Sequence, residues 1–164
     1  MFDLTHLHPM IVHFPIALLI VAFLADLGGL VLKKDFFNKV GLLLLVLGTA
    51  GVVAAYFSGH SAAEGLTEAG PLKMAMENHE DAALVTLWII VATMVVRLAL
   101  VAFKKYQGMV RWVPLVLFLV GVASVARTGY YGGELVFKHA AGVQLSIGAF
   151  GADAGNEADT EEDD

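Results

Sequence analysis

Four long apolar segments, each bounded by charged or polar residues, follow one another along the chain. They cover residues 10–32, 40–59, 81–103 and 112–136. A helix needs about 20 apolar residues to cross the hydrocarbon core of a bilayer, and each segment reaches that length. The pattern therefore predicts an all-α protein with four transmembrane helices.

The links between these segments indicate how the helices pack. They read "KKDFFNK", "HSAAEGLTEAGPLKMAMENHE" and "KKYQGMVR", so two are short and one is of moderate length. Short links make sequential helices antiparallel neighbours, as in a four-helix bundle. We assign residues 1–143 to this membrane domain. Residues 144–164 are acidic and poor in apolar side chains, which is typical of a disordered tail.

Lysine and arginine are distributed unevenly over the links. The first and third links carry Lys33, Lys34, Lys39, Lys104, Lys105 and Arg111, whereas the middle link has Lys73 against four glutamates. Cytoplasmic links carry the excess of Lys and Arg, so both termini and the middle link are predicted outside the cytoplasm. No basic residue precedes the first apolar segment, which argues against a cleavable signal peptide.

Composition narrows the class of protein further. Hydrophobic residues make up 58% of the chain and charged residues 16%, against about 25% charged in soluble domains. The chain is thus predicted to be integral to a lipid bilayer, and it has no basic surface for nucleic acid. It contains no cysteine, which excludes thiolate metal sites and covalently attached c-type haem.

All six histidines fall at the outer end of the predicted bundle. They are His6, His8, His13, His60, His79 and His139. In "HPMIVHFP" the two histidines are five residues apart, so on a helix they point about 140° away from each other and serve different positions. We interpret His8, His13, His79 and His139 as metal ligands at the rim of a site. For His6 and His60 a plain interfacial position is favoured.

Small residues at helical spacing lie at the same depth. Gly51, Ala55 and Gly59 are on the second segment, and Gly129 and Gly133 are on the fourth, with Tyr130 beside them. Such spacing lets helices approach closely. The alternative is that these residues leave room for a flat cofactor.

Three of the charged residues within the apolar segments, Asp26, Arg97 and Arg127, lie away from the segment ends. Asp26 and Arg97 are at equal depth, which predicts a structural ion pair near the cytoplasmic interface. Arg127 lies in the outer half of the fourth segment. Its expected partner is a cofactor carboxylate near the histidines; the alternatives are Glu134 or snorkelling to the interface.

Two stretches carry a family resemblance. "HPMIVHFPIALL" (8–19) and "TGYYGGELVFKHAAGV" (128–143) resemble the signature ends of domain-of-unknown-function family 2231, small bacterial membrane proteins with four predicted helices. The similarity spans residues 7–143. It implies a place in the bacterial inner membrane and puts the family's histidines at His8, His13, His79 and His139. Some relatives are fused to c-type cytochrome domains, which implies electron transfer on the outer side.

These observations favour an electron-transfer protein over an enzyme with substrate chemistry of its own. Paired imidazoles from facing helices ligate haem iron, and four histidines would suffice for one or two haem b groups. Quinone, a c-type cytochrome or respiratory complex subunits are the expected partners. One alternative is a copper or zinc site of these histidines with Glu77, Glu80, Glu134, Met74 or Met76. Another is a structural or assembly subunit, or a homo-oligomer.

Overall fold

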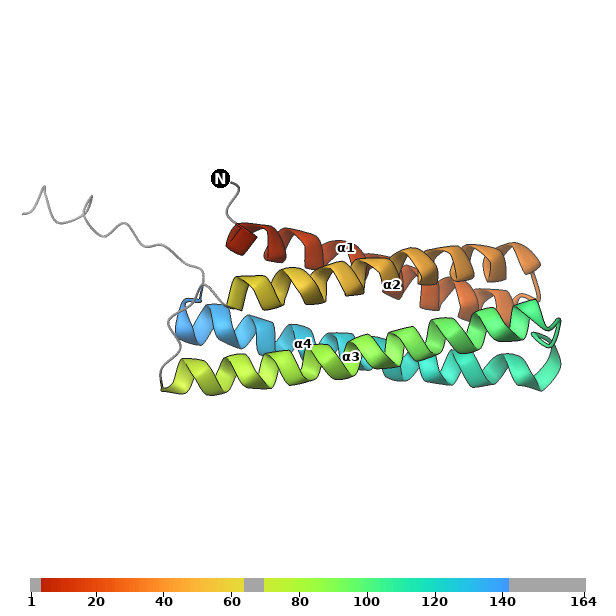
Figure 1. The fold of residues 1–164 in the computed structure, drawn as a ribbon. Helices are drawn as coiled ribbons and strands as arrows, with labels where there is room; N and C mark the ends of the chain where they lie inside the picture. The colour runs from red at the N-terminus through yellow and green to blue at the C-terminus, as the bar shows by residue number, and fades with distance from the viewer. Residues whose placement is uncertain (1–3, 64–69, 142–164) are drawn as a thin grey trace, which may run out of the picture.

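The computed structural model describes residues 4–63 and 70–141, with side chains from His8 onward. Four long helices run antiparallel in one bundle (Figure 1): α1 (Leu4–Val31), α2 (Asp35–Ala63), α3 (Pro71–Ala102) and α4 (Trp112–His139), the last preceded by a 3₁₀ turn, η1 (Gly108–Arg111). The described ranges contain no strand. The prediction of an all-α four-helix bundle is confirmed. The predicted tail, 144–164, and the side chain of His6 lie outside what the structure describes.

The helices extend beyond the bounds predicted from the apolar segments. The largest difference is in α3, which begins at Pro71, whereas the apolar segment begins at 81. The thickness of the hydrocarbon core sets the length of the apolar segment but not the length of the helix. The helix can continue through polar residues at the interface. Because α1 begins at Leu4, Pro9 lies inside this helix, beyond its first turn. Pro71 does take a first-turn position, where its missing N–H costs nothing.

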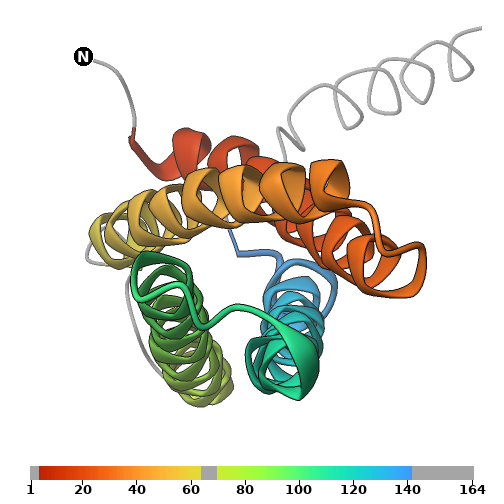
Figure 2. The same ribbon diagram turned by 90° about the vertical axis from the view of Figure 1, so that its right-hand side faces the viewer.

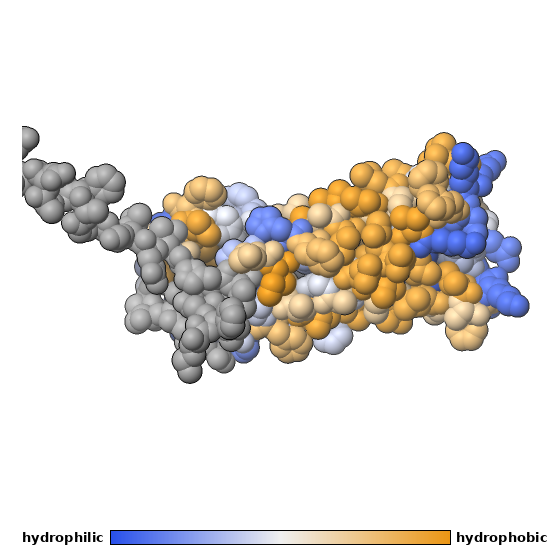
Figure 3. Space-filling view, turned by 90° about the horizontal axis from the view of Figure 1, so that it is seen from above, coloured by the Kyte–Doolittle hydropathy of each residue, from blue (hydrophilic) through white to orange (hydrophobic). Residues whose placement is uncertain are grey.

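The two ends of the bundle differ in character. The links after α1 and α3 lie together at one end, which we call the link end (Figure 1). Two residues after each of these helices ends, a lysine takes the left-handed backbone region: Lys33 with φ 54° and Lys104 with φ 55°. In Figure 3 this end is hydrophilic, while a hydrophobic band covers the middle of the molecule. All four helices are long and apolar enough to cross a membrane.

The bundle consists of two tightly packed hairpins. Helix α1 packs mainly on α2 and α3 mainly on α4, and the contacts between the hairpins are less extensive (Figure 2). Glycines allow the close approach in the first hairpin. A Cβ on Gly51 would lie 3.0 Å from the Cβ of Pro15, and one on Gly48 would lie 2.8 Å from Leu19. Gly51 therefore serves helix packing, the simpler of its two predicted roles.

Apolar side chains fill the middle of the bundle. Leu19, Ala22, Leu45, Ile90 and Phe118 form a fully buried cluster contributed by all four helices. At the link end, the carboxylate of Asp26 and the guanidinium of Arg97 are 2.9 Å apart, with side chains 3% and 1% exposed. The predicted ion pair is confirmed. Towards the other end, which we call the terminal end, the histidines gather.

Candidate cofactor site

Two histidines from different hairpins meet inside the terminal end of the bundle. His8 on α1 and His79 on α3 are both half-buried. Their ring centroids are 6.5 Å apart, and the ring planes are nearly perpendicular, at 78°. Because the two residues come from separate hairpins, the tertiary packing of the hairpins sets this approach.

The ring of His79 is held in one tautomer. Its Nδ1 lies 3.2 Å from the backbone carbonyl oxygen of Thr128 on α4. A carbonyl oxygen can only accept a hydrogen bond, so Nδ1 carries the proton and donates it. In neutral imidazole the other nitrogen, Nε2, then has a free lone pair that can bind a metal ion.

His8 reaches the same state through a hydroxyl group. Its Nδ1 is 3.0 Å from Ser58 Oγ on α2, and Ser58 Oγ in turn donates to the carbonyl oxygen of Ala55 at 3.0 Å. Since the hydroxyl proton is directed to Ala55, the Ser58 oxygen accepts from His8 Nδ1–H. The lone pair of His8 Nε2 is free as well. Metal-binding histidines in proteins usually have their second ring nitrogen fixed in this way.

Each imidazole lies against a glycine of a neighbouring helix. A Cβ on Gly59 of α2 would come within 2.8 Å of His8 Cε1, and a Cβ on Gly132 of α4 would come within 3.2 Å of His79 Cε1. Gly59 and Gly132 therefore make room for the two rings. Larger side chains there would push the imidazoles out of their observed positions.

The histidine pair lies between a layer of hydroxyl groups and an apolar layer. On its inner side, Thr86 of α3 is 2.6 Å from Ser124 Oγ and 2.9 Å from Thr128 Oγ1, both on α4. On its outer side, Ala63, Met76 and Leu135 form a buried apolar cluster. Met76 precedes His79 by three residues, about 5 Å along α3. This cluster shields the pair from the end of the bundle.

The other predicted ligands, His13 and His139, lie apart from this pair, as does His60, which was predicted to be interfacial. His13 is exposed, and its Nδ1 bonds to the carbonyl oxygen of Pro9 on the same helix, at 2.5 Å. His8 and His13 thus point to different sides of α1, as their spacing predicts. His60 is exposed, 4.0 Å from Glu80. His139 is the last residue of α4 and half-buried.

The structure therefore brings His8 and His79 together, but not His13 or His139. Within residues 8–63 and 70–141, no three side chains of His, Cys, Asp or Glu are grouped so that they could hold one metal ion. His13 and His139 stay predictions for a second position.

The predicted cofactor-contacting residues are spread over two surfaces. Gly51 and Ala55 lie on α2, where Gly51 faces α1. Gly129, Tyr130 and Gly133 line a shallow groove of about 280 Å³ on α4, together with Glu134, Phe137 and Lys138. A Cβ on Gly129 or Gly133 would meet nothing within 4 Å, so these glycines face out of the bundle.

Arg127 has an aromatic neighbour and not the predicted acidic one. Its side chain is exposed, and Cζ lies 5.3 Å from the ring centre of Tyr131. Glu134 pairs with Lys138 at 2.7 Å, one helical turn further along α4. Glu134 is therefore not the partner of Arg127. The cofactor carboxylate proposed for Arg127 stays a prediction.

Sequence reasoning missed the groups that orient the two imidazoles. Ser58 is two residues before His60, and Thr128 opens the glycine-rich stretch of α4. A hydroxyl residue close to the terminal end of an apolar helix could have drawn attention to Ser58. The partner of His79 is a backbone carbonyl oxygen, for which the sequence holds no signal.

Comparison with known proteins places the chain in a family. A family model described as "Predicted membrane protein (DUF2231)" matches residues 5–145. No curated protein and no solved structure shows significant similarity to the chain.

Proposed function

The chain belongs to the DUF2231 family of predicted membrane proteins, and we propose that it binds haem b between His8 and His79 and transfers electrons near the outer face of the membrane. One observation carries the proposal: two facing imidazoles, both with Nδ1–H directed to an acceptor and Nε2 free. Bound haem would supply a one-electron couple at its iron. The protein would supply two imidazole ligands, hydroxyl groups on the inner side and an apolar cluster on the outer side.

The spacing of the two rings fits a shared metal ion. Imidazole nitrogens bind first-row metal ions at about 2.0–2.1 Å, so two imidazoles on one ion have ring centroids roughly 6–6.5 Å apart. The observed distance between the centroids of His8 and His79 is 6.5 Å. The ring planes of the two histidines are nearly perpendicular, at 78°; His8 and His79 would hold the iron, which would supply a one-electron couple. This distance between the ring centroids supports the proposal that the two imidazoles share one ion.

The number of ligands favours haem over zinc. Structural zinc sites take four protein ligands and catalytic sites take three, whereas haem iron needs two axial ligands because the porphyrin supplies four nitrogens. The pair of His8 and His79 meets the second requirement. In the described part of the chain no third His, Cys, Asp or Glu completes a cluster with this pair.

Copper is the second candidate, and a buried methionine favours it. Met76 is 8% exposed and lies one helical turn before His79 on α3, so the two side chains share a face of the helix. Thioether sulfur and imidazole suit cuprous copper. Exchange of Met76 for leucine keeps the volume and removes the sulfur, which separates the two candidates.

Absorption spectra test the proposal directly. Protein purified in detergent from cells with ample haem supply should show a sharp reduced α-band after dithionite. His8→Ala and His79→Ala should each abolish the six-coordinate spectrum, and Met76→Leu should preserve it. His60→Ala is the matched control, since it removes an exposed imidazole at the same end. His13→Ala reports on a second haem: it should lower haem content only if His13 binds one.

Two results would decide against haem. A colourless wild-type protein that contains copper, with copper lost on Met76→Leu, would establish the second candidate. A colourless and metal-free protein would favour a structural or assembly role within a membrane complex. The electron partner, quinone or a c-type cytochrome, follows from the outer position of the site and is testable only once haem is found.

A further inference from the structure

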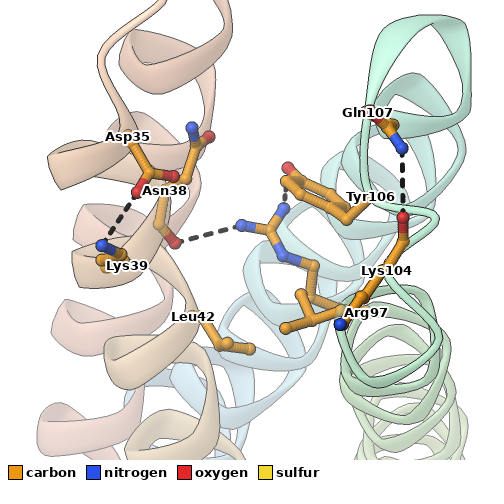
Figure 4. Close-up of a pocket in the computed structure, with 9 residues that line it drawn as sticks. Asp35, Asn38, Lys39, Leu42, Arg97, Lys104, Tyr106 and Gln107 are labelled. Carbon is orange, nitrogen blue, oxygen red and sulfur yellow. Dashed lines mark hydrogen bonds and ion pairs between the residues drawn. The ribbon is translucent and has the colours of Figure 1, made fainter.

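A second polar site lies at the link end, far from the histidines. It is a pocket of about 330 Å³ between α2 and α3, closed at one side by the link after α3 (Figure 4). Its lining residues are Asp35, Asn38, Lys39, Leu42, Arg97, Val101, Lys104, Tyr106 and Gln107. The pocket thus combines three cationic side chains, one carboxylate, neutral polar groups and apolar side chains.

The inner wall of the pocket is the buried guanidinium of Arg97. Its Nη2 donates to Asp26 at 2.9 Å and to the backbone oxygen of Asn38 at 3.1 Å, and its Nη1 donates to the hydroxyl of Tyr106. The guanidinium carbon also lies 3.6 Å from the centre of the Tyr106 ring. Only Nε–H of this side chain, itself 1% exposed, is buried without an acceptor. Such a donor is costly unless something accepts from it.

A second guanidinium makes the local charge positive. Arg111 donates to Asn38 Oδ1 at 2.7 Å, and its own Nε–H is also buried without an acceptor. Arg97 thus pairs with the buried carboxylate of Asp26, and Arg111 lies beside this pair through its bond to Asn38. Burial raises the pKa of the Tyr106 phenol above its usual value, although the guanidinium of Arg97 lowers it. The phenol is thus neutral near pH 7, and its O–H remains available to donate.

The mouth of the pocket carries two lysines above apolar residues. Lys39 and Lys104 line it, with Leu42 and Val101 on the side towards the middle of the bundle. Lys39 pairs with Asp35 at 2.9 Å, but both side chains are more than 70% exposed. Exposed pairs of this kind contribute little free energy, so Lys39 can turn to another anion.

We propose that this pocket binds the phosphate of an anionic phospholipid headgroup. Inside the pocket, Arg97 and Tyr106 would donate hydrogen bonds to the phosphate oxygens. At the mouth, Lys39 and Lys104 would donate as well, and hydrogen bonds from cations to phosphate are strong. Leu42 and Val101 continue the pocket towards the hydrocarbon, where acyl chains lie. Basic pockets between transmembrane helices commonly hold acidic headgroups. If the link end faces the cytoplasm, the lipid belongs to the inner leaflet.

Lipid titration followed by native mass spectrometry tests the site. The full-length protein in neutral detergent is titrated with phosphatidylglycerol and, separately, with phosphatidylcholine of the same acyl chains. Phosphatidylglycerol should bind at least tenfold more tightly. Lys39→Gln/Lys104→Gln should weaken it roughly 25-fold, since each lysine near an anionic headgroup contributes about fivefold. Lys33→Gln/Lys105→Gln, which removes the same charge at the same end outside the pocket, should change it less than twofold.

Three outcomes separate the possibilities. Equal affinity for the two lipids would overturn the proposal, because phosphatidylcholine has no net charge and the pocket would then not select an anionic headgroup. Equal weakening by both double variants would also overturn it, because that result means general attraction to charge. Inorganic phosphate is the third arm. If it displaces phosphatidylglycerol at an equal free concentration, the anion site stands but soluble phosphate fills it, and the lipid assignment fails. Failure to compete assigns the site to the lipid.

Discussion

Gly59 of α2 lies against the imidazole of His8, so closely that a methyl group on it would come within 2.8 Å of the ring carbon Cε1. The two residues belong to different helices of the first hairpin. Gly59 thus sets how far the His8 ring can sit between the helices. This contact makes the position of the proposed ligand sensitive to a single methyl group.

Gly59→Ala is therefore expected to displace His8 and to lower haem content strongly. A contact at 2.8 Å is well inside ordinary van der Waals separation, and all three nearest atoms belong to the His8 ring, so the ring has to move. The measurement is the haem-to-protein ratio of the purified variant. Gly133→Ala is the matched control, because a Cβ there meets nothing within 4 Å. Haem loss in Gly133→Ala with none in Gly59→Ala would place the cofactor in the α4 groove instead.

The hydrogen bond from His8 to Ser58 gives a second prediction. Ser58→Ala removes the acceptor of His8 Nδ1–H, and loss of such an orienting partner typically weakens metal binding about 10–100-fold. Thr128→Val is the informative counterpart. It removes the hydroxyl but keeps the backbone carbonyl that accepts from His79, so haem affinity should change little. Haem titration of the apoprotein compares the two, and equal affinities would remove Ser58 from the site.

The ion pair and the histidine pair show what could be predicted from the sequence. Asp26 and Arg97 were paired correctly because depth in an apolar helix follows from residue position at about 1.5 Å per residue. That argument needs only the topology. The same reasoning correctly predicted that the histidines lie at one end of the bundle.

The sequence could not predict which histidines lie opposite each other. The depth of a residue along its helix does not determine how one hairpin is rotated relative to the other. This rotation depends on side-chain packing, such as Gly59 against His8 and Gly132 against His79. Helical spacing did show that His8 and His13 point apart, but not which one faces inward. Resemblance to the family gave both residues equal weight.

The buried pair at the link end yields a stability prediction. Asp26→Ala leaves the guanidinium of Arg97 without its counter-ion in a site 1% exposed, which should lower the free energy of unfolding by about 3–5 kcal/mol. Glu134→Ala breaks the more exposed pair with Lys138 and should cost less than about 1 kcal/mol. Unfolding in mixed micelles, followed by circular dichroism, measures both. Similar losses in the two variants would show that Asp26 adds nothing beyond a surface pair.

The orientation of the bundle is the prediction on which the outer position of the proposed haem site depends. The chain has no cysteine, so single thiols can be placed at will. Ser61→Cys lies at the terminal end and Gln107→Cys at the link end; both positions are exposed, and neither change removes a lysine or arginine.

Because lysine and arginine are concentrated at the link end, a membrane-impermeant maleimide should label Ser61→Cys on intact bacterial cells, and Gln107→Cys only after lysis. Labelling of both variants after lysis controls for accessibility of the thiols. The reverse pattern on intact cells would put His8 and His79 beside the cytoplasm. Periplasmic cytochromes would then be excluded as direct partners, whereas the two-histidine haem site would stand, since its geometry does not depend on orientation.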